Sequence, residues 1–84
     1  MPPEVQAAIA GLGKRPRSGR LRAVIESICR SREWTTVRQL SAYVGVSEKS
    51  LRSRHLPAMI REGRLTWRFP NRPRHRGQAY GAKD

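Results

Sequence analysis

Basic side chains gather in two short stretches of this 84-residue sequence, one after Ser47 and one between Pro70 and Gly77. Arginine offers a planar fork of donors that can grip a phosphate or the edge of a guanine through two parallel hydrogen bonds. Lysine and serine add single donors to such contacts. The candidate residues are Lys49, Ser50, Arg52, Ser53 and Arg54 in the first stretch, and Arg72, Arg74, His75 and Arg76 in the second. For all of them an ordinary solvated surface is the competing interpretation.

Residue patterns that carry catalysis are missing. His55 and His75 stand alone, without a further Cys or His at metal-ligand spacing, and no nucleophile–base set or Gly-rich phosphate loop occurs. Cys29 is the single cysteine, which rules out an intramolecular disulfide and favours a reducing compartment. It flanks an apolar stripe, so we interpret it as a core residue. We predict a chain that is not an enzyme and that uses no metal, cofactor or small-molecule substrate.

The overall charge points to a polyanionic partner. The sequence has 18 Lys and Arg against 6 Asp and Glu, a net charge of +12, in a chain long enough for one small domain. Such an excess on a compact domain is typical of nucleic-acid binding, and a solvated or histone-like charge without a specific partner is the alternative. No apolar run approaches the ~20 residues of a membrane helix, and the start does not resemble a signal peptide. We therefore expect a cytoplasmic protein without a membrane partner.

Helical periodicity positions the first basic stretch. The spacing predicts a helix over residues 18–31, with an apolar stripe made of Leu21, Val24, Ile25 and Ile28. Thr36 and Gln39 have capping-box spacing, which starts a second helix that Gly45 ends. Ser47 then caps a third helix. Two helices joined by so short a turn predict a helix-turn-helix, and taking Leu51 as the inward direction turns the basic residues outward.

The third helix contains Pro57, a residue that breaks helices. An uninterrupted helix would place core residues at 54, 55 and 58 after Leu51, but the apolar residues are Leu56, Met59 and Ile60, which are out of phase with it. The phase slip and the proline mark the same place. We predict that the helix bends or restarts at residues 55–57, and that His55 and Leu56 both turn inward there.

After Gly63 the period changes from helix to strand. Leu65, Trp67 and Phe69 alternate with polar residues, and Gln78-Ala79-Tyr80 returns as a second strand beyond a basic loop. Stacking platforms for single-stranded bases are an alternative role for the aromatic residues, but the alternation favours a core face for Trp67 and Phe69. The predicted fold is α+β and mostly helical: a winged helix-turn-helix over residues 19–82, with a three-helix core and a C-terminal β-hairpin wing.

Residues 1–18 are expected to form an N-terminal arm or linker, in which residues 5–12 have the spacing of a short amphipathic helix. Its basic residues Lys14, Arg15 and Arg17 are expected to lie along a nucleic-acid backbone, to belong to a hinge toward another domain, or to do both. Thr36 and Arg38, at a helix start, are further candidates for backbone contact, because helix N-termini offer free N–H groups to phosphate.

The order of these motifs resembles a known bacterial module. Leu51-Arg52, His55-Leu56-Pro57-Ala58-Met59-Ile60 and Gly63, followed by Phe69-Pro70-Asn71-Arg72-Pro73 and Gln78-Ala79-Tyr80, are similar to the C-terminal winged helix of RecG-related transcriptional regulators and some Fic-type proteins. His55 replaces the aromatic usual in that module, and Arg64 replaces an apolar residue. The resemblance implies the DNA-binding module of a larger bacterial transcriptional regulator or helicase-related protein, associated with the nucleoid.

Double-stranded DNA is accordingly the first predicted partner, with other domains of a parent protein as a second. A winged helix that docks proteins, or one that binds RNA, is the alternative. The DNA prediction requires that Lys49 and Arg52 lie on the same side of the folded domain as the arginine-rich hairpin loop.

Overall fold

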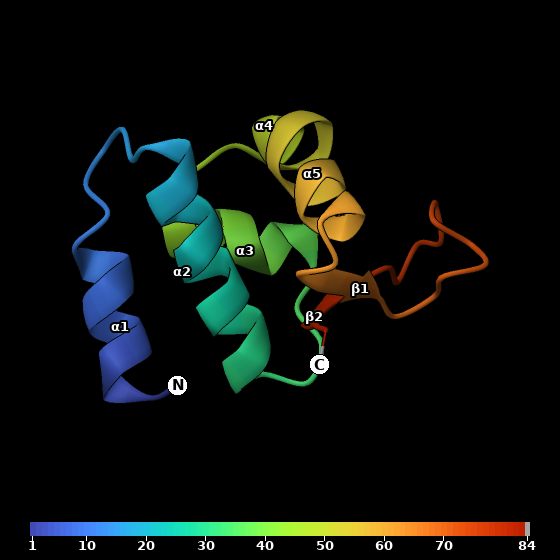
Figure 1. Cartoon of the computed structure of the whole chain (residues 1–84), viewed down its shortest axis with the longest axis horizontal. Coiled ribbons are helices and arrows are strands. Elements are labelled where there is room, and N and C mark those ends of the chain that lie inside the picture. The colour runs from blue at the N-terminus through green and yellow to red at the C-terminus, as the bar shows by residue number, and fades with distance from the viewer. Residues whose placement is uncertain (84) are drawn as a thin grey trace.

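The helices come first along the chain and a small antiparallel sheet follows them (Figure 1). The structure is a computed structural model, and it describes residues 1–83. The helical segments are α1 (Pro3–Ala10), α2 (Ser18–Ser31), α3 (Val37–Val44), α4 (Glu48–Ser50), the π-helical turn η1 (Leu51–His55) and α5 (Leu56–Arg61), and the strands are β1 (Leu65–Trp67) and β2 (Tyr80–Ala82). The chain is therefore a small α+β domain. Within residues 1–83, the structure has no helix with the length and apolar character needed to cross a bilayer.

Helix α2 is the centre of the core. The predicted stripe is confirmed, because Leu21, Val24, Ile25 and Ile28 are all buried, and Cys29 beside them is 1% exposed. From the other elements, Leu40, Val44, Leu51, Leu56, Met59 and Leu65 complete one continuous apolar cluster around them. Burial of this surface is the main stabilising term in a domain of this size.

Helix α1 packs against α2 (Figure 1). Val5 and Leu12 are buried in the common core, and Ala8 and Ile9 contact it from the edge. The apolar spacing expected for a short helix in residues 5–12 is thus used for packing. Between α1 and α2, the turn that follows α1 and the basic segment 13–17 lie outside regular structure.

The predicted helix boundaries around the turn are confirmed. The Thr36 hydroxyl accepts a hydrogen bond from the Gln39 N–H at 3.1 Å, and the Gln39 side chain accepts one from the Thr36 N–H at 2.9 Å. Gly45 ends α3 in the left-handed conformation, with φ 72°, where a side chain would cost energy. Ser47 caps the next helix by accepting from the Ser50 N–H at 3.1 Å.

Segments α4, η1 and α5 form one composite helix, and Pro57 lies near the start of α5 (Figure 1). The predicted bend or restart at residues 55–57 is confirmed as to its place, since α5 begins at Leu56, but the helix does not break there and the backbone stays in the helical region. It widens instead: the Leu56 N–H donates to the carbonyl of Leu51, five residues back. A π-turn contains one extra residue, which shifts the phase of everything after it. Leu51, His55, Leu56 and Met59 are consequently all buried, as the inward turn of His55 and Leu56 required.

The two strands pair antiparallel, with Leu65 opposite Ala82 and Trp67 opposite Tyr80. On the outer edge of β2, Tyr80 exchanges two backbone hydrogen bonds with Thr35, of 2.9 and 2.8 Å. Thr35 directly precedes the capping residue of α3. The sheet therefore fixes the start of α3 against the hairpin.

Gly81 is required by the close approach of Trp34. A Cβ added at Gly81 would lie 2.9 Å from the Trp34 ring and 3.1 Å from the carbonyl oxygen of Glu33. We expect Gly81→Ala to lower the free energy of unfolding by about 1–3 kcal/mol, as overpacking does. Urea denaturation followed by circular dichroism measures it.

Gly19, in the first turn of α2, is the matched control, because an added Cβ there meets nothing within 4 Å. Gly19→Ala should leave stability unchanged or raise it by up to about 1 kcal/mol, through helix propensity. Equal effects of the two substitutions would contradict the proposed contact between Gly81 and Trp34.

Candidate functional site

A groove of about 890 Å³ opens between the start of α3, the composite helix and the hairpin loop. It brings together residues from three separate parts of the sequence. Its cationic members are Arg38, Arg52, Arg74 and Arg76, and its apolar members are Val37, Pro57, Trp67, Pro73 and Tyr80. Thr36, Glu48, His75 and Gln78 complete the lining. The required geometry is therefore met for Arg52, which lines the same groove as the tip of the hairpin loop.

The predicted residues of the composite helix differ in whether they line the groove and in how exposed they are. Arg52 lines the groove together with Glu48, whose Oε1 accepts from Arg52 Nη2 at 3.1 Å. Lys49 and Ser53 are exposed and do not line the groove, and the Ser53 hydroxyl donates to the Lys49 carbonyl oxygen at 2.8 Å within the helix. Ser50 is only half-buried, so it keeps some accessible surface.

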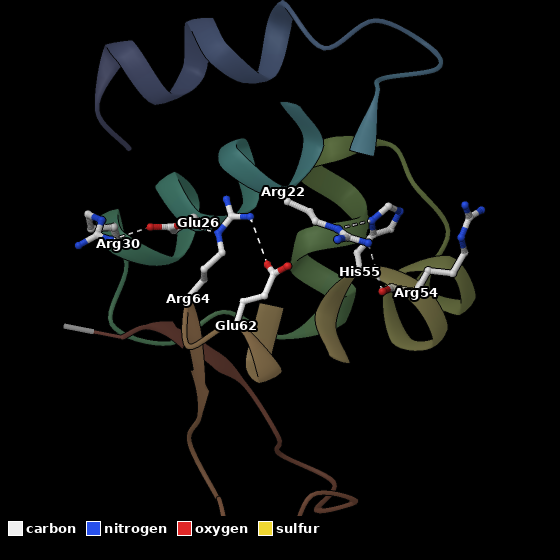
Figure 2. A network of polar contacts seen from close by, with 7 residues as sticks. All are labelled: Arg22, Glu26, Arg30, Arg54, His55, Glu62 and Arg64. Carbon is white, nitrogen blue, oxygen red and sulfur yellow. Dashed lines mark hydrogen bonds and ion pairs between the residues drawn. The ribbon is translucent and has the colours of Figure 1, made fainter. Parts of the chain in front are cut away.

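The backbone of Arg54 is in contact with Arg22 of α2, and its side chain points away from this contact (Figure 2). Its backbone carbonyl oxygen accepts a hydrogen bond from Arg22 Nη2 at 3.5 Å, and its own side chain is exposed. Of the five predicted residues in this helix, the structure therefore brings only Arg52 into the groove.

The hairpin loop, residues 68–79, is held by its own side chains. Gln78 spans it: its Oε1 accepts from the Phe69 N–H at 3.0 Å, and its Nε2 donates to the Phe69 and Arg72 carbonyl oxygens at 3.1 and 3.2 Å. The His75 ring stacks on Phe69 with centroids 4.0 Å apart, and its Nδ1 accepts from the Gly77 N–H at 2.8 Å. These contacts hold the loop in shape while Arg72, Arg74 and Arg76 remain exposed.

His75 was predicted as a ligand contact, and its ring is already engaged within the loop. Gln78 was not singled out in the sequence, although its side chain closes the loop through three bonds to Phe69 and Arg72. A lone glutamine gives no sequence signal for such a role, because its partners lie up to nine residues away.

The predicted core face of β1 is confirmed for Leu65, which is 1% exposed, and is wrong for Trp67 and Phe69. Both are half-buried and lie outside the core cluster: Trp67 lines the groove, and Phe69 carries the His75 stack. Alternation correctly placed Leu65 and Trp67 on one face of the strand. The core covers Leu65, however, and leaves Trp67 partly exposed. Tyr80 lies opposite Trp67 on the same face. Burial raises the pKa of Tyr80, against the opposing effects of Trp67 and the Arg52 charge, so its hydroxyl stays neutral.

Arg22 and His55 connect α2 with the wide turn of the composite helix (Figure 2). Arg22 Nε donates to His55 Nδ1 at 3.2 Å, and His55 is 6% exposed. Burial lowers the pKa of His55, and the charges of Arg22 and Arg54 lower it further. The neutral imidazole is therefore the form that fits this site, since Nδ1 must accept the hydrogen bond.

An ionic contact connects α2 with the entry to β1 (Figure 2). Glu26 accepts from Arg64 Nε at 2.7 Å and from Arg30 Nη2 at 2.8 Å, and these hydrogen bonds lower the pKa of its carboxyl group. Arg64 also lies 3.7 Å from Glu62. Glu26 and Arg30 are four residues apart on α2, so they lie on the same face of this helix.

The remaining predicted backbone contacts lie apart from one another. Arg38 lines the groove, whereas the Thr36 hydroxyl is occupied by its capping bond. Lys14, Arg15 and Arg17 are exposed on the segment between α1 and α2, at the opposite end of the molecule from the hairpin loop (Figure 1). The structure does not bring this basic segment to the groove.

Groups that could support catalysis are few. Burial raises the pKa of the Cys29 thiol to about 12, so it stays protonated and unreactive at neutral pH. Among residues 1–83, no three His, Cys, Asp or Glu side chains lie close enough together to hold a metal ion.

Comparisons with protein-family models, curated proteins and solved structures give no match for this chain. The similarity to the winged helix of RecG-related regulators stays a prediction. Any functional assignment consequently depends on the groove and its charges.

We expect acid to weaken the fold through His55. Because its folded-state pKa is lowered, the unfolded chain takes up the proton first, so stability is complete above the ordinary value of 6.5 and declines as the pH falls below it. His55→Gln should flatten this part of the pH profile, measured by urea unfolding from neutral to mildly acidic pH. His75→Gln is the matched control and should keep the decline. An equally steep decline in His55→Gln would contradict this role of His55.

Proposed function

We propose that this chain binds double-stranded DNA as a winged helix, with the composite helix against the major groove and the hairpin loop on the flanking backbone. The order of elements supports this fold: α2, the bridge at Thr35, α3, a short turn, the composite helix and then the hairpin. In such modules the helix after the turn reads base edges through its N-terminal half. Arg52 lies in that half.

The observation that carries the proposal is the convergence of Arg38, Arg52, Arg74 and Arg76 on one groove. Four guanidinium groups from α3, the composite helix and the loop line it, and among residues 1–83 the only carboxylate that lines it with them is that of Glu48. Like charges so close together repel one another, and a row of phosphates relieves that repulsion while releasing counterions. Arginines that serve only to solvate the surface would not be expected to converge on one groove from three segments of the chain.

The contacts divide into two kinds. Arg74 and Arg76 are exposed on a loop that Gln78 already orders, so phosphate contact costs little conformational entropy. Arg52 is suited to guanine O6 and N7, a contact worth about 1–3 kcal/mol of discrimination against a wrong base. Its partner Glu48 must then release it or share it, because an exposed pair of this kind is worth only about 0.3–0.5 kcal/mol.

The further assignment, to the DNA-binding module of a larger bacterial regulator, is supported by the motif resemblance alone. Docking to other domains of a parent protein and RNA binding are alternatives to the DNA proposal, and no contact in the groove favours either of them. Competition between DNA and RNA duplexes of equal length distinguishes B-form from A-form recognition.

Neutralising the loop should weaken DNA binding more than neutralising the segment after α1. Arg74→Ala with Arg76→Ala should lower affinity for a short duplex by about tenfold or more at low salt and reduce the log K against log salt slope by about two. Fluorescence anisotropy at several salt concentrations measures both.

Lys14→Ala with Arg15→Ala removes the same charge from the opposite end of the molecule and is the matched control. It should leave both quantities near their original values. Equal losses in the two double variants would mean that net charge alone drives binding, and would overturn the groove as the binding site.

Removing the carboxylate from the groove should strengthen binding. Glu48→Gln deletes the one negative charge near the phosphates and frees Arg52, so we expect an affinity several-fold higher. Glu62→Gln is charge-matched, since Glu62 lies beside Arg64 rather than in the groove. The same gain in both variants would show that Glu48 has no local effect on the ligand.

A further inference from the structure

The groove contains an aromatic surface, and a phosphate backbone would not be stabilised by contact with it. Trp67 and Tyr80 are directly opposite each other in the antiparallel pair, so their side chains lie side by side on one face of the sheet. Both are half-buried and line the groove, with Val37 and Pro57 next to them. Flat apolar surface of this kind gains free energy from contact with another apolar face and nothing from anionic oxygens.

The charges around this surface select the class of ligand. Arg52, Arg74 and Arg76 line the same groove. A purely apolar side chain would leave these guanidinium groups without a counter-charge, and a bare anion would leave the rings of Trp67 and Tyr80 in water. A nucleotide satisfies both requirements, because its base is a planar aromatic ring and its phosphate is an anion.

We propose that the groove takes an unpaired nucleotide, its base stacked on Trp67 and Tyr80 and its phosphate held by the surrounding arginines. The ligand would then be a duplex next to a single-stranded segment, in preference to a fully paired one; in this form the inference rests on the proposed function. Bases inside an intact duplex expose only their edges, so their faces are not accessible to Trp67.

The groove is formed in advance of binding. Its floor belongs to the paired strands, and its far wall is the loop that Gln78 and the His75–Phe69 stack hold in place. A base entering it meets positioned rings, and little side-chain freedom remains to be lost.

The test measures the binding of four unlabelled DNA molecules to the whole chain. Three of them are duplexes: one with blunt ends, one that carries a short overhang of unpaired thymidines, and one whose overhang has abasic sites in place of the thymines. The fourth is the thymidine strand alone. Trp34→Phe leaves Trp67 as the single tryptophan, so quenching reports stacking at that ring. Where Trp34→Phe fails to fold, ¹⁹F NMR of the otherwise unaltered chain labelled with fluorotryptophan separates the two indoles.

The thymidine overhang should bind about fivefold tighter than the blunt duplex, the lower end of the gain from stacking one base on an aromatic ring, and should quench Trp67. The abasic overhang has the same phosphates and should give neither effect. Trp67→Leu should abolish the difference in affinity between the thymidine and the abasic overhang, and Trp67→Phe should retain part of it.

The outcomes separate the two proposals. Blunt-duplex binding with equal affinity for the thymidine and abasic overhangs, or with no change at Trp67, overturns the nucleotide site and leaves duplex binding standing. Binding of the single strand with Trp67 quenching but no affinity for the blunt duplex supports the nucleotide site and overturns the duplex proposal. Absence of binding to all four probes overturns both.

Discussion

The wide turn of the composite helix is the constraint on which the rest of the structure depends. Leu51, at the start of the wide turn, is buried in the core, and Leu56 and Met59, which follow the turn, are buried there as well. In a regular α-helix these sets are out of phase, and one of them would have to face water. The single extra residue of the π-turn puts both in the core. Glu48, Arg52 and Pro57 then share the side that lines the groove.

The arginines of this chain are divided between two tasks. Several are tied to partners within the body: Arg22 to His55, Arg64 to Glu26, and Arg32 to the Tyr43 hydroxyl at 2.8 Å. These contacts join α2, or the residue that follows it, to the composite helix, to the turn before β1 and to α3. The arginines of the hairpin loop are different, since Arg72, Arg74 and Arg76 are exposed and no ion pair links them to another of residues 1–83. Their mutual repulsion is a standing cost to the fold, and an external anion removes it.

Local patterns in the sequence predicted much of the fold. The stripe of α2, the capping box at Thr36 and the stop at Gly45 depend on residues a few positions apart, so periodicity and capping rules found them. The phase slip correctly located the irregularity near Pro57. Its form was not predictable, because the choice between a break and a wide turn depends on tertiary packing, including the bond from Arg22, which is 33 residues from His55.

The candidate site was predicted less completely. Composition and clustering found Arg52, Arg74 and Arg76, but nothing in the sequence says which of the 18 basic residues converge. Alternation placed Leu65 and Trp67 on one face, yet could not show that the core ends between them. The loop contacts of Gln78 likewise join groups that periodicity does not relate.

Strand β2 shows why the groove and the core behave as one unit. Its neighbouring residues serve opposite faces: Gly81 is buried against Trp34, while Tyr80 faces the groove and pairs through its backbone with Thr35. Moving Tyr80 would therefore break the bridge to α3 and disturb the Trp34 contact together. A ligand in this groove would therefore meet rings on a backbone that is already positioned, and any adjustment of the protein would be confined to the exposed guanidinium groups.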